Sequence, residues 1–145
     1  MYALHPITIH FPIALLLANV LFSVLYLWRG DRAWESSAYH CLLFGWIACL
    51  PALATGTYDA IRQLVGPDAP RDNALISWVN AHAFLNIAAM VVYGQALLRR
   101  RRNPGILDDP IVRRSYLTLL AIGAITLSIG GWIGGHLVYI LHLGI

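Results

Sequence analysis

The chain has 145 residues, of which 59% are hydrophobic and only 12% are charged, and its formal net charge is +3 at pH 7. A soluble domain usually carries about a quarter of its residues as charged side chains. The low charge content and the mean hydropathy of +0.65 exclude an ordinary soluble domain and indicate an integral membrane protein.

The first apolar stretch covers residues 7–28 and follows the segment "HPITIHFP". It exceeds the roughly 20 residues that a helix needs to cross a bilayer. No basic residue precedes it and no small-residue cleavage site follows it, so it does not have the pattern of a removable signal peptide. We expect it to remain as the first membrane-spanning helix.

Three further spans are expected at residues 39–64, 74–98 and 115–141. Gly66, Pro67 and Pro70 break the chain after the second span, and the segment 103–105, Asn-Pro-Gly, breaks it after the third. The stretches are continuously apolar, whereas strands of a membrane β-barrel alternate in polarity. The sequence predicts an all-α, antiparallel bundle of four transmembrane helices that forms one domain over residues 1–145, with no internal repeat.

Arginine placement predicts the orientation of the bundle. All ten basic residues are arginines, and residues 99–114 contain six of them. Because successive spans alternate in direction, Arg29 and Arg32 lie on the same side of the membrane as residues 99–114. Only Arg62 and Arg71 remain for the opposite side. By the positive-inside rule, both termini face the periplasm of a bacterial inner membrane. The arginine run is interpreted as a solvated anchor at the membrane surface, so no nucleic-acid partner is expected.

Histidines on three different spans are expected in the outer half of the bundle. At about 1.5 Å per residue, His10 lies roughly 5 Å deep, and His82 and His136 about 12 to 13 Å deep. An ionisable side chain inside a span suggests a functional site, whereas His5, His40 and His142 are expected to be structural residues at the interface. The predicted outer-leaflet cluster contains these residues: His10, Asp59, Arg62, His82, Asn86 and His136.

Four segments of the chain stand out as motifs: "HPITIHFPIALL", "TGTYDAI", "HAFLN" and the closing "GGHLVYILHLGI". Together they resemble a bacterial membrane family catalogued as domain of unknown function 2231. The resemblance covers essentially the whole chain and supports the fold and topology. It places the following residues at the motif positions of the family: His5, Pro6, His10, Pro12, Gly56, Asp59, His82, Asn86, Gly134, Gly135 and Tyr139.

A b-type haem fits the predicted cluster best among cofactors. Two neutral imidazoles from facing helices are usual axial ligands in a four-helix bundle, and Arg62 or Arg71 would meet the propionates. Zinc or copper held by His10, His82 and His136, with Asp59 as a further donor, is the next option. A hydrogen-bond network that only holds the helices together, for example His10 or His82 to Asp59, stays open.

A stand-alone enzyme is not expected, because the sequence has no HExxH, GxSxG or glycine-rich phosphate loop. The leading hypothesis is a small inner-membrane electron-transfer protein. The alternative is a non-catalytic accessory subunit that packs against a larger membrane redox complex, or a homo-oligomer, in contact with the lipid bilayer. Glycines at positions 130, 131, 134 and 135 would allow the close helix packing that this alternative requires.

Overall fold

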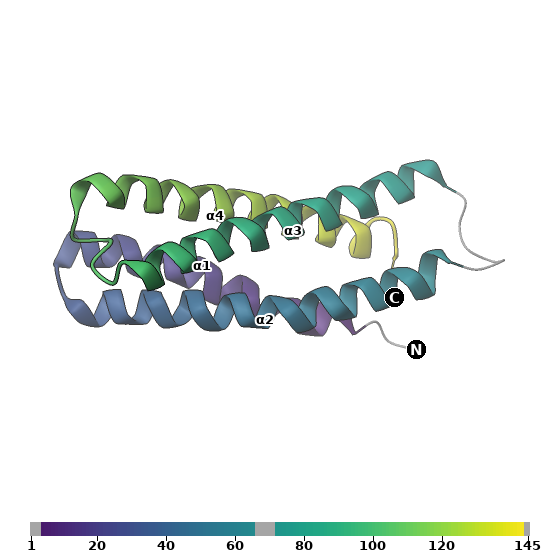
Figure 1. Ribbon diagram of the computed structural model, residues 1–145. Coiled ribbons are helices and arrows are strands. Elements are labelled where there is room, and N and C mark those ends of the chain that lie inside the picture. Colours follow the sequence, from purple (N-terminus) through teal and green to yellow (C-terminus); the bar gives the residue numbers. More distant parts are fainter. Residues whose placement is uncertain (1–3, 66–71, 144–145) are drawn as a thin grey trace.

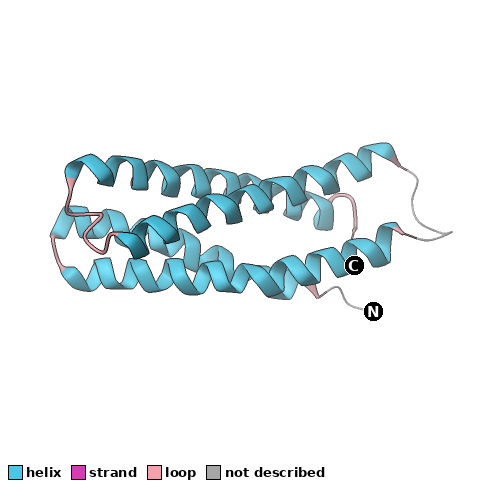
Figure 2. Ribbon diagram, in the orientation of Figure 1, coloured by secondary structure: helices cyan, strands magenta, loops and turns pink. Residues whose placement is uncertain are grey.

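The structure is a computed structural model that describes residues 4–65 and 72–143. It contains four antiparallel helices (Figure 1), and the described residues include no strand (Figure 2). The helices are α1 (His5–Arg29), α2 (Arg32–Leu64), α3 (Asn73–Arg102) and α4 (Pro110–Tyr139). Each is long and apolar enough to cross a membrane. The predicted all-α fold with four spans is confirmed.

The helices extend beyond the apolar stretches, because polar residues cap them. Asp31, Asp72 and Asp109 each accept a hydrogen bond from the backbone N–H two residues later, at 2.9, 2.8 and 2.8 Å. Such caps satisfy N–H groups that have no partner within the helix. The second helix therefore begins at Arg32 rather than near residue 39. The predicted break at 103–105 is confirmed, whereas the break at 66–70 lies outside the described residues.

The bundle has two chemically different ends. Figure 1 shows the α1–α2 turn and the connection between α3 and α4 at the same end of the bundle, called the arginine-rich end. His5 begins α1 at the opposite end, called the histidine end, and its ring centroid is 6.0 Å from that of His82. At the arginine-rich end Ile106 and Leu107 are each only 3% exposed. The α3–α4 connection therefore folds inward and packs against the core.

The four helices form two hairpins, because α1 packs mainly against α2 and α3 mainly against α4. Large apolar side chains lie on the outer surface, among them Ile7, Phe84 and Trp132, as expected for helices in contact with lipid. The buried face of α1 is partly polar and includes Asn19 and Ser23. The large apolar side chains on the outer surface agree with a membrane environment.

The two hairpins have the same burial pattern. Four of the five buried residues of α1, Pro12, Leu16, Asn19 and Ser23, have buried counterparts in α3 that lie 77 residues later: Ala89, Tyr93, Ala96 and Arg100. Every buried residue of α2 likewise has a buried counterpart in α4, 78 residues later. These pairs are Ala38 and Tyr116, Leu42 and Leu120, Gly45 and Gly123, Ala52 and Gly130, and Asp59 and Leu137.

The structure therefore contains an internal repeat that the sequence pattern did not show. Because α1 and α3 run in the same direction, an approximate two-fold axis along the bundle relates the hairpins. Few identities accompany it, chiefly Leu42 and Leu120, Gly45 and Gly123, and Gly56 and Gly134. The repeat is therefore evident in which positions are buried, and much less in which amino acids occupy them.

Candidate functional site

His5 lies in the first turn of α1 and is held by the neighbouring helix α2. Its backbone N–H donates to Oδ2 of Asp59 at 2.8 Å, and its Nδ1 is 2.9 Å from the carbonyl oxygen of Ala52. Gly56 lies beside the ring, where a Cβ would come within 3.0 Å of Nδ1 and Cε1. No side chain at the start of α1 caps the helix, so Asp59 supplies this function from α2.

His82 of α3 is held by α4 in the same way. Its Nδ1 is 2.8 Å from the carbonyl oxygen of Gly130, and a Cβ at Gly134 would lie 2.8 Å from its Cε1. Asn86, one turn later, donates from Nδ2 to the carbonyl oxygen of His82 at 2.8 Å. A Cβ at Gly130 would come equally close to the Asn86 amide, so both glycines make room for polar side chains of α3.

The two histidines are equivalents in the internal repeat. His5 and His82 are 77 residues apart, their carbonyl partners Ala52 and Gly130 are 78 apart, and the glycines beside the rings, Gly56 and Gly134, are also 78 apart. The ring centroids are 6.0 Å apart with an interplanar angle of 82°. Each hairpin therefore contributes one imidazole, and we call His5 and His82 the histidine pair.

The hydrogen bonds of the histidine pair fix the tautomer of each ring. A carbonyl oxygen only accepts hydrogen bonds, so each Nδ1 must carry the hydrogen in these contacts. In a neutral imidazole the Nε2 atom then has a free lone pair, which is the usual arrangement of a metal-binding histidine. The donor set of the histidine pair therefore fits a single metal ion or a haem iron.

Polar groups surround His5 on the side of α2. The Thr8 hydroxyl donates to the carbonyl oxygen of His5 at 2.9 Å and lies 2.8 Å from the Thr55 hydroxyl. Asp59 is only 6% exposed, and its Oδ1 atom has no hydrogen-bond partner. A buried carboxylate oxygen without a partner is costly. The histidine pair thus has an unused acceptor close to one of its members.

The structure brings three of the predicted site residues into this region and leaves three outside it. Asn86 contacts His82, and Asp59 contacts the backbone of His5. The other three lie on the surface or towards it. His10 is exposed, and Arg62 is exposed with its guanidinium 5.7 Å from the Tyr58 ring. The His136 ring packs against the rings of Trp78 and Trp132.

The geometry of the helix explains why the histidines predicted as metal ligands do not converge. His10 follows His5 by five residues, a rotation of about 140°, and so faces away from the interior. His136 is two residues beyond Gly134, about 200° around α4 from the glycine that contacts His82. Within residues 4–65 and 72–143, no group of three or more His, Cys, Asp or Glu side chains is placed to hold a metal ion. Arg71, named with Arg62 for haem propionates, lies outside the described residues.

Sequence reasoning left His5 out of the predicted cluster and gave it a structural role at the interface, whereas the structure places its ring beside that of His82. The signal that could have found it is the repeat: the interval from His5 to His82 matches the interval from Gly56 to Gly134 to within one residue. Two weakly similar hairpins with a histidine and a glycine at equivalent positions predict two equivalent imidazoles.

Comparison with known proteins identifies one family. A family model described as "Predicted membrane protein (DUF2231)" matches residues 1–145. No curated protein and no solved structure matches the chain. Because the family model spans the chain from end to end, the protein belongs to the DUF2231 family of predicted membrane proteins.

Proposed function

We propose that this membrane protein binds a b-type haem through His5 and His82 and serves in electron transfer. The observation that carries the proposal is the equivalent anchoring of the two rings, each by Nδ1 to a backbone carbonyl of its own hairpin, at a centroid separation of 6.0 Å. His5 replaces His10 in the ligand set expected from the sequence. The distribution of the arginines supports an orientation in which the histidine pair would lie in the outer half of a bacterial inner membrane.

The residues around the histidine pair have distinct roles in this proposal. Haem would supply one-electron redox chemistry. Ala52 and Gly130 hold the rings in the Nδ1–H tautomer and so keep each Nε2 available as a ligand. Gly56 and Gly134 let the rings lie close to α2 and α4, and Asn86 fixes the α3 turn that carries His82.

An absorbance spectrum of the purified protein tests the proposal. The protein is expressed with ample haem, solubilised in mild detergent, and measured oxidised and then reduced with dithionite. We expect a low-spin b-type spectrum that His5→Ala and His82→Ala abolish or shift. His10→Ala and His40→Ala, which remove exposed histidines, should leave it unchanged. A colourless wild-type protein, or a spectrum indifferent to both ligand variants, would contradict haem binding.

The second candidate function is that of an accessory subunit or homo-oligomer. Gly131 and Gly135 of α4 are four residues apart, and a Cβ at either position would meet nothing within 4 Å. Two glycines at this spacing on an open helix face allow another helix to pack closely. Gly135→Leu should then weaken association in detergent, measured by light scattering or co-purification, without altering the spectrum of the histidine pair. An unchanged assembly state would count against this candidate.

A further inference from the structure

Among the described residues, three buried polar side-chain atoms have no hydrogen-bond partner, and two of them, Asn19 Oδ1 and the Ser23 hydroxyl oxygen, lie on α1. Asn19 and Ser23 of α1 are both 0% exposed. The Asn19 amide donates from Nδ2 to the carbonyl oxygen of Ala38 at 2.8 Å, but its Oδ1 atom and the Ser23 hydroxyl have no partner. In a membrane-spanning helix each such group costs free energy, because no bulk water reaches it. These two atoms therefore require a partner.

Ser23 differs from most other hydroxyl residues of the bundle. Serine and threonine inside helices usually donate back to a carbonyl oxygen three or four residues earlier. Six hydroxyl residues of α2, α3 and α4 do so: Thr55, Thr57, Ser77, Ser115, Thr118 and Thr126. The Ser23 hydroxyl makes no such bond, so it remains free to donate to a group in the interior.

The two unpartnered atoms lie on the same face of α1 and complement each other. Ser23 follows Asn19 by four residues, so the side chains are neighbours along the helix. Asn19 Oδ1 is an acceptor, and the Ser23 hydroxyl is both a donor and an acceptor. One water molecule between them would donate to Asn19 and accept from Ser23. Buried waters typically satisfy two to four polar groups in this way.

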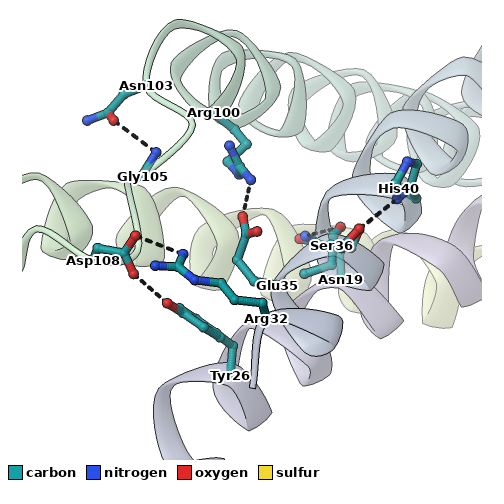
Figure 3. Close-up of polar contacts among 11 residues, drawn as sticks. Asn19, Tyr26, Arg32, Glu35, Ser36, His40, Arg100, Asn103, Gly105 and Asp108 are labelled. Carbon is teal, nitrogen blue, oxygen red and sulfur yellow. Dashed lines mark hydrogen bonds and ion pairs between the residues drawn. The ribbon is translucent and has the colours of Figure 1, made fainter. Parts of the chain in front are cut away.

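The surroundings towards the arginine-rich end are also polar. Tyr26 is one turn after Ser23, is 7% exposed, and donates from its hydroxyl to the Asp108 carboxylate, whose side chain is 40% exposed. Arg100, the equivalent of Ser23 in the second hairpin, is 8% exposed and pairs with Glu35. Figure 3 shows these side chains grouped beneath the α3–α4 connection. A polar layer therefore extends from the surface into the bundle.

Towards the histidine end the polar layer stops. Leu16, one turn before Asn19, is 0% exposed, and the Tyr93 hydroxyl donates to its carbonyl oxygen at 3.3 Å. The Leu16 side chain itself offers no hydrogen-bonding group. The buried Leu16 side chain thus lies between Asn19 and the histidine end along α1.

We propose that Asn19 and Ser23 form an internal water-binding site in the arginine-rich half of the bundle. The water bridges Asn19 Oδ1 and the Ser23 hydroxyl, and Leu16 closes the site towards the histidine end. The site does not depend on a cofactor, so it stands apart from the proposed haem.

Water-edited solid-state NMR of the full chain in bilayers of deuterated lipid tests the site. The experiment measures how fast magnetisation passes from water protons to each labelled side chain. We expect Asn19 and Ser23 to receive it several-fold faster than Leu16, which is equally buried, and at a rate closer to that of exposed Ser115. Transfer to Asn19 and Ser23 as slow as to Leu16 would overturn the proposal.

A variant with little effect on the fold provides the second arm. Ser23→Ala removes one partner of the water and leaves the bond between Asn19 and Ala38 in place. We expect transfer to the Asn19 side chain to slow by several-fold in Ser23→Ala and to stay unchanged in the control Ser115→Ala. Fast transfer to Asn19 in both variants would show that Ser23 does not hold the water, and would overturn the shared site.

Discussion

Each imidazole of the histidine pair depends on the absence of a side chain at a neighbouring position. Gly56 lies beside the His5 ring and Gly134 beside the His82 ring, on the helix that also supplies the carbonyl partner. A methyl group at either position would push the ring away from that carbonyl. The glycines are therefore needed for ring placement, and not only for close packing of helices.

Replacing Gly134 with alanine tests this dependence. A Cβ there would lie 2.8 Å from Cε1 of His82, so the ring must move and its bond to Gly130 weakens. We expect a loss of about 1–3 kcal/mol in the free energy of unfolding, the usual cost of overpacking. Unfolding in mixed detergent micelles measures it. The matched control is Gly135→Ala, because a Cβ there meets nothing within 4 Å; equal losses in both variants would contradict the role given to Gly134.

Asp108 gives the arginine-rich end a dependence on pH. The Tyr26 hydroxyl and, next, the Arg32 guanidinium donate to this carboxylate and lower its pKa. The ionised Asp108 carboxylate contributes its full share to the free energy of unfolding above the pKa of an unfolded aspartate, about 3.9. It is lost as the pH falls through the lowered pKa of the folded state. Protonation then weakens the tie between the α3–α4 connection and α1.

The pH dependence is measured by thermal unfolding in detergent between neutral pH and pH 2. The wild type should unfold at a higher temperature than Asp108→Asn near neutral pH, and the two curves should converge in acid. Asp109→Asn is the control for a general loss of an acidic residue in the same connection. A constant difference between wild type and Asp108→Asn at every pH would show that the ionised carboxylate is not responsible.

Part of the site could be predicted from single residues. His82 and Asn86 lie four residues apart inside an apolar span, and the structure places them in contact. His10 also lies inside an apolar span but is exposed. The prediction used depth along the helix, which gives no information about the direction in which a side chain points around the helix axis. His5 was left out of the predicted cluster because its ring is held by a backbone carbonyl of another helix, which has no sequence signal of its own.

At the scale of the helices, the arginine run does more than anchor the bundle. Arg99, Arg101 and Arg102 are exposed, as the sequence predicted, but Arg100 is buried and pairs with Glu35 of α2. Its guanidinium also lies 5.2 Å from the Tyr39 ring. Composition could not distinguish the four arginines, because only the helical rotation of about 100° per residue turns one of them inward. The pair joins the second hairpin to the first.

The buried pair and the exposed pair at this end should differ in their contributions to stability. The side chains of Arg100 and Glu35 are 10% and 12% exposed, whereas those of Arg32 and Asp108 are 66% and 40% exposed. Removing one partner of a buried pair leaves an uncompensated charge and costs about 3–5 kcal/mol. Exposed pairs contribute about 0–1 kcal/mol. Glu35→Ala should therefore destabilise the protein far more than Arg32→Ala.

Equilibrium unfolding of both single variants and of Glu35→Ala with Arg100→Ala provides the comparison. The double variant should lose less than the sum of its two single variants, because the second substitution removes the charge that the first left unpaired. Additive losses would mean that the two side chains stabilise the bundle independently. Similar losses in Glu35→Ala and Arg32→Ala would contradict the difference in burial.

At the scale of the whole molecule, the fold consists of two equivalent hairpins with one imidazole from each at the same end. The number of spans and their antiparallel order could be predicted from apolar length alone. The pairing of α1 with α2 and of α3 with α4 could not, because it depends on small residues such as Gly45 and Gly123, which admit side chains of the neighbouring helix. The repeat becomes visible only when buried positions are compared.

The location of the histidine pair in the membrane depends on the predicted orientation of the two-hairpin bundle. Eight of the ten arginines belong to the arginine-rich end, and the positive-inside rule assigns that end to the cytoplasm. Reporter fusions at Met1 and Ile145 should therefore be active only as periplasmic reporters, and a reporter inserted after Asn103 only as a cytoplasmic one. Inserting the same reporter within the Gly66–Arg71 segment provides the control, because it must agree with the termini in any four-span topology. A cytoplasmic signal at both termini would contradict this orientation and would place the histidine pair in the inner half of the membrane. An electron carrier on the periplasmic side would then meet the arginine-rich end and not the histidine pair.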